Sequence, residues 1–136
     1  MCQDYYQKAK EHNVSLVTGS FQRISFWEYQ TKAEFVGIDV YREKYVDYIN
    51  SPFSFFDECA ACWGKLYSHD LIGNSKFLEN HIFEDTGFVY PILLKAKIGY
   101  EFVRDDYLYR DTPGGIMDKL KLPNSKIFDI IAFSLS

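Results

Sequence analysis

Two adjacent carboxylates, Glu84 and Asp85, are the strongest candidates for chemistry in this sequence. They follow a loop-like stretch and precede apolar residues at helical spacing, so we expect them in the first turn of a helix. A carboxylate in that place can face a cleft and act as a general base. It can also do no more than offset the positive end of the helix dipole. Position alone leaves both interpretations open.

A second candidate is the C-x-x-C pattern formed by Cys59 and Cys62. Zinc usually takes four ligands, and the sequence offers neither a second such pair nor a paired histidine motif. A redox pair would sit at the N-terminus of a helix, whereas the stretch from Trp63 to Tyr67 is typical of a strand. The pattern therefore favours two ordinary half-buried cysteines, and a thiol oxidoreductase is the minor alternative.

Composition limits the classes of protein. The 136 residues include 15 basic and 19 acidic side chains, a net charge of −4, with 47% apolar residues. These values predict one soluble domain, and the lack of a basic cluster argues against nucleic-acid binding. No apolar run suits a transmembrane segment, and no signal peptide is recognisable. We expect a cytoplasmic protein, with peripheral contact to a membrane left open.

The motifs of several common enzyme classes are missing. The sequence contains no G-x-x-x-x-G-K-[ST], G-x-G-x-x-G, G-x-S-x-G or H-E-x-x-H. Nucleotide hydrolysis by a P-loop, dinucleotide binding, ester hydrolysis and zinc proteolysis by those motifs are therefore not indicated.

The elements that must position these residues alternate between helix and strand. Helices are expected over 1–12, over 39–50 with Asp39 as N-cap, from Glu84 until Gly99 ends it, and after a cap at Asn124 or Ser125. Strands are expected over 14–19 with alternating burial, over 21–29 paired beside it, and over 61–67, 100–103 and 107–110, with turns at 73–75 and 113–115. The fold class is α/β, a mixed sheet with flanking helices in one piece.

Five motifs occur in an order that resembles the second half of the family 2 glycosyltransferases. They are a Trp-x-Lys-Leu-Tyr strand at 63–67, a Phe-x-Glu turn at 77–79, Phe-Glu-Asp-Thr-x-Phe at 83–88, Tyr-x-Tyr-Arg at 107–110 and a small-residue loop at 114–116. The opening helix and strand, from Tyr5 to Gly19, are similar to those that follow the donor-binding half in that family. The resemblance covers nearly the whole chain and implies part of a GT-A fold.

The resemblance also implies roles for five residues. Asp85 would be the base of an inverting transfer from a nucleotide sugar to a hydroxyl of a glycan acceptor, because a neutral hydroxyl is a poor nucleophile. Glu84 would bind the acceptor or hold Asp85, and Trp63 would stack on a sugar. Lys65 and Arg110 would reach phosphate or hydroxyl oxygens. The alternatives are core packing for Trp63 and surface charge for Lys65 and Arg110.

One departure from the family is large. None of the eleven Asp residues form the D-x-D motif that holds a divalent metal, Mg²⁺ or Mn²⁺, in the donor-binding half. We therefore expect residues 1–136 to form a single or partial domain, the acceptor side of such an enzyme, which is inactive alone and binds no cofactor itself. The missing donor half is an expected partner, and a homo-oligomer is expected because losing that half uncovers apolar surface. A non-enzymatic interaction module is the alternative function.

Overall fold

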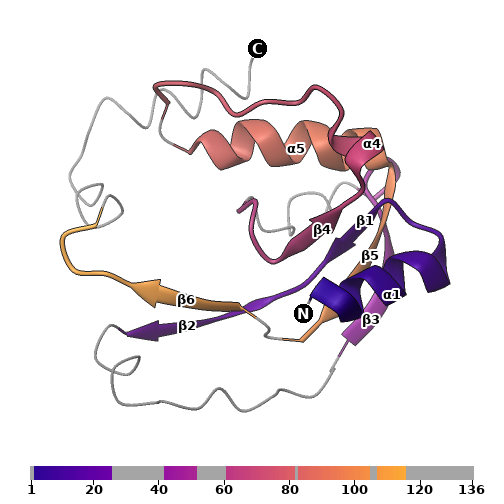
Figure 1. Cartoon of the computed structure of the whole chain (residues 1–136), viewed down its shortest axis with the longest axis horizontal. Coiled ribbons are helices and arrows are strands. Elements are labelled where there is room, and N and C mark those ends of the chain that lie inside the picture. The colour runs from indigo at the N-terminus through magenta and orange to yellow at the C-terminus, as the bar shows by residue number, and fades with distance from the viewer. Residues whose placement is uncertain (1, 26–41, 52–60, 82, 105–106, 116–136) are drawn as a thin grey trace.

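The computed structural model describes residues 2–25, 42–51, 61–81, 83–104 and 107–115. The expected cap at Asp39 and the expected last helix after Asn124 lie outside these residues. The described elements, in chain order, are α1 (Cys2–His12), β1 (Leu16–Thr18), β2 (Phe21–Ser25), β3 (Arg42–Asp47), β4 (Lys65–Tyr67), α4 (His69–Ile72), α5 (Glu84–Ala96), β5 (Ile98–Val103) and β6 (Tyr107–Asp111) (Figure 1).

The strands form two sheets. The larger sheet has the order β3-β5-β1-β4, in which β1 and β5 are parallel and the two outer strands are antiparallel to their neighbours. The smaller sheet pairs β2 with β6 in parallel. The chain runs almost directly from β1 into β2 and from β5 into β6, so the two central strands of the large sheet lead into the small one (Figure 1).

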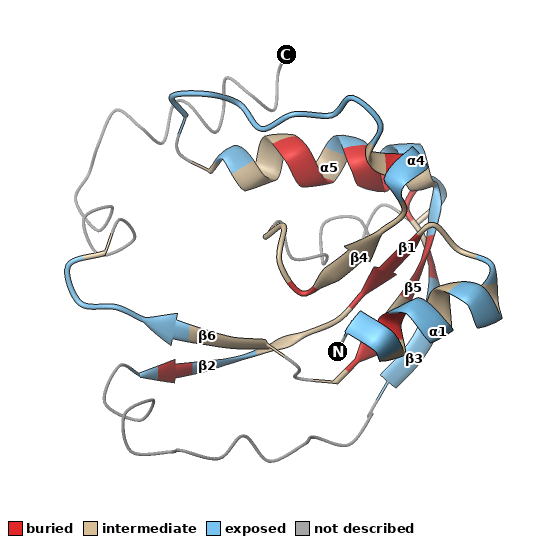
Figure 2. Cartoon of the chain, in the orientation of Figure 1, coloured by how far each residue is buried: buried red, intermediate tan, exposed pale blue. Residues whose placement is uncertain are grey.

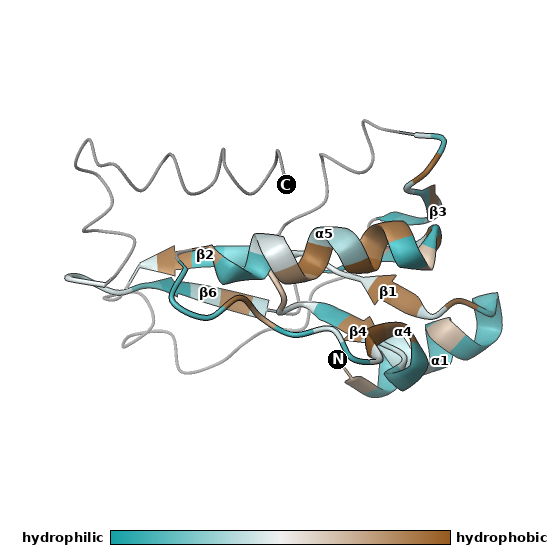
Figure 3. Cartoon of the chain, turned by 90° about the horizontal axis from the view of Figure 1, so that it is seen from above, coloured by the Kyte–Doolittle hydropathy of each residue, from teal (hydrophilic) through white to brown (hydrophobic). Residues whose placement is uncertain are grey.

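Helices cover both faces of the large sheet. Viewed from above, α1 lies on one side of the sheet and α5 on the other (Figure 3). The α5 side holds the larger apolar cluster, and the α1 side a smaller one built around Tyr5, Val17, Tyr100 and Phe102. Buried residues accordingly follow β1, β5 and the sheet-facing side of α5 (Figure 2). The predicted class, a mixed α/β sheet with flanking helices, is confirmed.

The helix expected over 39–50 is wrong, because residues 42–47 form strand β3. Val46 is buried against the α5-side cluster, whereas its neighbour Tyr45 contacts the ring of Tyr100 on the opposite face. The residues therefore alternate between two faces with the period of a strand. The run Arg42 to Lys44 has good helix formers, but charged residues are also what an edge strand carries.

Three further expectations need correction. Strand β1 is buried at all three residues rather than alternately, because helices cover both faces of the sheet. Strand β2 pairs with β6 and not with β1, since it continues β1 in line. Gly99 lies inside β5 rather than ending α5, and a Cβ there would come within 2.9 Å of the Tyr48 hydroxyl oxygen. The expected strand over 61–67 is confirmed only for Lys65–Tyr67.

Other elements agree with the sequence. The opening helix is confirmed, and so is the helix that starts at Glu84 and buries Phe88, Val89, Ile92 and Leu93. Among the described helices, none is long and apolar enough to cross a membrane.

Candidate functional site

Asp85 lies where the sequence predicts it, in the first turn of α5 after Phe83, which adopts a left-handed conformation with φ of 64°. Its carboxylate is half-buried, and Oδ2 accepts a hydrogen bond of 3.2 Å from the backbone N–H of Cys62. The neighbouring Glu84 is exposed. A bond across 23 positions of sequence thus ties the start of α5 to the segment that leads into β4.

Cys62 shows the electrostatic effect of this contact. Burial raises the pKa of the Cys62 thiol, and the negative charge of Asp85 raises it further. The thiol therefore stays protonated at neutral pH, which makes it a poor nucleophile. Cys62 also lies in a bend before β4 rather than at a helix N-terminus, so the structure gives no support to a redox role. Cys59 lies outside the described residues.

The segment that contacts Asp85 is held by further bonds. The hydroxyl of Tyr67 donates to the carbonyl oxygen of Cys62 at 3.3 Å. The ammonium of Lys65 donates to the carbonyl oxygen of Ala61 at 2.9 Å. Both side chains come from β4, so the strand fixes the peptide groups that in turn fix Asp85. Lys65 therefore has a structural role, because its ammonium holds the carbonyl group of Ala61.

Trp63, the residue after Cys62, belongs to an aromatic cluster of Phe21, Trp63, Tyr107 and Tyr109. The Trp63 ring stacks on Tyr107 with centroids 4.4 Å apart and planes 8° apart. Phe21 meets it edge-on at 4.9 Å, and Tyr109 lies at 5.5 Å. Phe21 and Tyr107 are register partners in the small sheet, which places their side chains on one face. All four residues remain partly exposed.

Basic residues near the aromatic cluster differ from the expectation. Arg23 lies over the Tyr109 ring at 5.3 Å and pairs with Asp111 at 3.4 Å. Arg110 follows Tyr109 in β6, and successive residues of a strand face opposite sides. The strand therefore presents Arg110 on the face opposite to the aromatic cluster. The backbone of Ala61 and Cys62 connects Asp85 to Lys65 and to the neighbouring Trp63, whereas Arg110 lies on the other face of β6.

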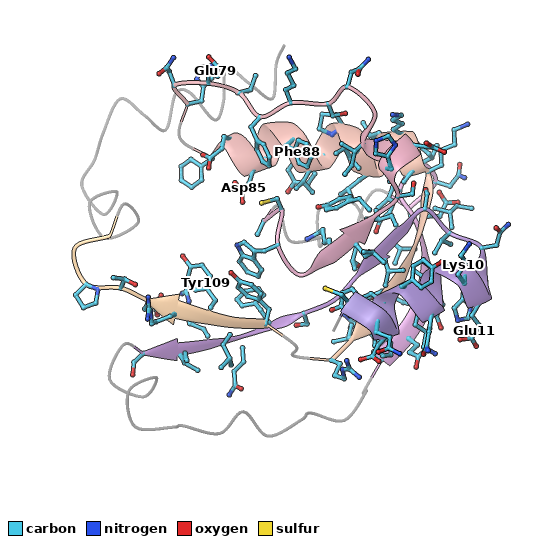
Figure 4. All side chains as sticks on the ribbon, viewed as in Figure 1. Lys10, Glu11, Glu79, Asp85, Phe88 and Tyr109 are labelled. Atoms are coloured by element: carbon cyan, nitrogen blue, oxygen red, sulfur yellow. The ribbon has the colours of Figure 1, made fainter. Side chains whose placement is uncertain are left out.

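Asp85 and Tyr109, one member of the aromatic cluster, lie on facing elements, α5 and β6. In Figure 4 the side chain of Asp85 points from α5 toward the sheets, and that of Tyr109 points from β6 toward α5. Figures 1 and 3 both place the start of α5 over β2 and β6. A flat aromatic surface and a carboxylate on facing elements suit a ligand that has an apolar face and a hydroxyl rim, as a sugar ring does.

Sequence reasoning missed Phe21 and Tyr107 as contacts of Trp63, and Arg23 as a contact of Tyr109. The i, i+2 spacing of Tyr107 and Tyr109 indicates one shared strand face, and that signal was available. The parallel pairing that adds Phe21 and Arg23 joins segments more than 80 residues apart, for which the sequence gives no local signal.

Comparisons with known proteins add no family. A scan against models of protein families gave no match, and a search of curated proteins gave none either. Among the described residues, no group of three or more His, Cys, Asp or Glu side chains could hold a metal ion.

Proposed function

We propose that this chain is the acceptor-side part of an inverting family 2 glycosyltransferase of the GT-A type. The observation that supports it most is the bond that joins the Asp85 carboxylate to Cys62, directly before Trp63 in the aromatic cluster. This contact unites two separate motifs of the resemblance, the strand at 63–67 and the helix start at 83–88.

In the proposed reaction the acceptor sugar lies on the aromatic cluster with one hydroxyl hydrogen-bonded to Asp85. As the hydroxyl oxygen attacks the anomeric carbon of the donor sugar, Asp85 takes its proton. The new C–O bond forms while the bond from that carbon to the nucleoside diphosphate breaks on the opposite side, which inverts the configuration. In this proposal Glu84, which is exposed at the same helix start, contacts other parts of the acceptor.

The donor sugar in this proposal comes from a second half that carries the D-x-D motif and its Mg²⁺ or Mn²⁺ ion. The glycan acceptor and that donor half are the proposed partners, and self-association is the proposed state of the chain without it. We propose a cytoplasmic location for the reaction, at or near a membrane surface.

Acceptor binding can be tested on the chain alone. We expect calorimetric titration with a panel of oligosaccharides to give saturable binding for at least one, and Trp63→Ala to weaken it at least tenfold. Tyr45→Ala is the matched control, because Tyr45 is a 58% exposed aromatic residue outside the aromatic cluster. Binding by no member of the panel, or equal loss in both variants, would count against the proposal.

The alternative, a non-enzymatic interaction module, has one observation in its favour. Three large apolar side chains at the β3 edge of the sheet are each about half exposed. They are Tyr45 on β3, Ile49 just after it, and Ile98 on the adjacent β5. Exposed apolar groups along a sheet edge recruit other chains. Light scattering of the Ile49→Lys and Ile98→Lys variants tests this surface. Loss of self-association in both would support a partner surface there, and unchanged assembly would count against it.

A further inference from the structure

A cleft of about 410 Å³ lies between α1, the turn that follows it, and β4, the last strand of the large sheet. Its lining comes from α1, from the turn over 13–15 and from residues 66–69. We call it the α1–β4 cleft. Its volume falls within the usual range of small-molecule sites, about 300 to 1,000 Å³. None of the described residues that line it belongs to the aromatic cluster or to the contact of Asp85 with Cys62.

The floor of the α1–β4 cleft is apolar and belongs to the folded core. Asn13 adopts a left-handed conformation with φ of 51°, and its N–H donates to the carbonyl oxygen of Lys10. The N–H of Val14 donates to the carbonyl oxygen of Ala9. These two bonds form a Schellman motif, which ends α1 and brings Val14 close to Ala9. Both side chains pack on the smaller apolar cluster, and so does Leu66 of β4.

The rim of the cleft carries an aromatic ring and hydrogen-bond donors. Tyr6 is 57% exposed, and the Lys10 ammonium lies 5.6 Å from the centre of its ring. The Ser68 hydroxyl accepts from the backbone N–H of Leu71 at 3.2 Å, which leaves its own proton to donate. Asn13 adds an amide group, which also donates. An apolar floor with a few polar groups at the rim is the usual composition of a small-molecule site.

Charge decides which class of ligand suits the cleft. Among the described residues of its lining, Lys10 is the only Lys or Arg, and there is no Asp or Glu. His69 adds a positive charge only when it is protonated, and it lies 3.5 Å from Asp70. Glu11, the acid next to Lys10, lies 3.5 Å from the Lys8 ammonium. The cleft therefore presents one permanent positive charge, which a single negative charge matches best.

A second cleft, of about 550 Å³, shares residues 13–15 with the first but has the opposite charge. Asp47 lines it, and no Lys or Arg does so within the described part of the chain. An anion is therefore attracted to the α1–β4 cleft and repelled by the second cleft.

We propose that the α1–β4 cleft binds a small organic monocarboxylate with an apolar body. The carboxylate pairs with the Lys10 ammonium, which is exposed and follows the ligand on its flexible stem. The apolar body lies on the floor, with the Tyr6 ring at one side of it. A doubly charged group such as a phosphate monoester leaves one of its charges unmatched. The site does not depend on the proposed glycosyl transfer.

Titration followed by amide NMR spectra tests the role of charge, with benzoate, 3-phenylpropionate and hexanoate as probes, each beside its neutral amide. We expect at least one carboxylate to bind saturably with a dissociation constant of about 1 mM or lower, and about tenfold more tightly than its amide. Lys10→Met should abolish this preference and leave binding of the amide unchanged. Lys76→Met, the matched control, removes an exposed lysine outside the cleft and should change neither. Saturable binding by none of the carboxylates, or equal loss in both variants, would overturn the proposal.

The same spectra locate the site. Shifts should include the amides of Leu66 and Tyr67, which line this cleft but not the second one. Tyr6→Ala should weaken the carboxylate and its amide alike, because it removes an apolar wall. Tyr45→Ala removes a similarly exposed ring from the second cleft and should weaken neither. Shifts centred on the second cleft or on the aromatic cluster would refute the proposal, even if Lys10→Met lowered the affinity.

Discussion

The close approach of α1 to Gly19 gives a prediction with a defined size. A Cβ at Gly19 would lie 1.6 Å from the hydroxyl oxygen of Tyr5 and 2.7 Å from its Cζ. Tyr5 cannot easily move, because it is 1% exposed and packs edge-on against Phe102 at 5.8 Å. We expect Gly19→Ala to lower the free energy of unfolding by about 2–3 kcal/mol, the upper range for an overpacked core. In a chain of this size that lowers the melting temperature by about 6–12 °C.

The matched control is Gly114→Ala, where φ is +73° but no atom lies within 4 Å of the added Cβ. Alanine in that left-handed conformation costs about 1 kcal/mol. Both variants restrict the unfolded chain equally, so their difference, with the strain of about 1 kcal/mol at Gly114 added back, measures the clash. Urea unfolding supplies both values. Gly19→Ala should cost less unfolding free energy in a Tyr5→Ala background, because the clashing ring is then absent. Equal losses in Gly19→Ala and Gly114→Ala, or the same loss for Gly19→Ala with and without Tyr5, would refute the packing of α1 on the end of β1.

Three further outcomes follow from the same structure. Asp85→Asn should lower the pKa of the Cys62 thiol and speed its alkylation at pH 8, with exposed Cys2 as internal reference; an unchanged rate would contradict the contact between Asp85 and Cys62. The hydrogen bond from Lys8 lowers the pKa of Glu43. The ion pair of Lys8 and Glu43 therefore stabilises the fold fully above pH 4.5, the ordinary pKa of a glutamate, and this stabilisation is lost as the pH falls below that value. Glu43→Gln should therefore lose less stability than the parent between pH 5 and 3 in urea titrations, and parallel curves would argue against the ion pair. Finally, calorimetry with Mn²⁺ and nucleotide sugars should detect no micromolar binding by this chain, and saturable binding would show that it contains a donor site.

The sequence predicted best what local patterns determine. The helix from Glu84 is clear because Phe88, Val89, Ile92 and Leu93 recur at helical spacing and are buried together. Prediction from local patterns fails for residues 42–47. There the choice between helix and strand depends on pairing with β5, more than 50 residues away. Local propensity cannot decide that pairing, because charged residues suit both a helix surface and a sheet edge.

The candidate site was predictable in its parts rather than in its assembly. The sequence indicated the position of Asp85 in the first turn of a helix. It gave no sign that the backbone of Cys62 holds the carboxylate, since any residue can provide an N–H group. Nor did it indicate that β6 presents Arg110 on the side away from Trp63, because the face depends on the register with β2.

The central claim is that Asp85 is the base of a glycosyl transfer, and sugar transfer by an enzyme assembled with a donor half tests it most directly. Asp85→Asn keeps the side chain's shape but cannot take the acceptor's proton. We expect its transfer rate to fall by about 10² to 10⁴, or roughly 3 to 5 kcal/mol in activation free energy, with donor binding unchanged. Glu84→Gln, the matched control, should keep most of the rate. Transfer at the parental rate by Asp85→Asn would contradict the claim, and if Glu84→Gln alone were inactive, the base would be Glu84.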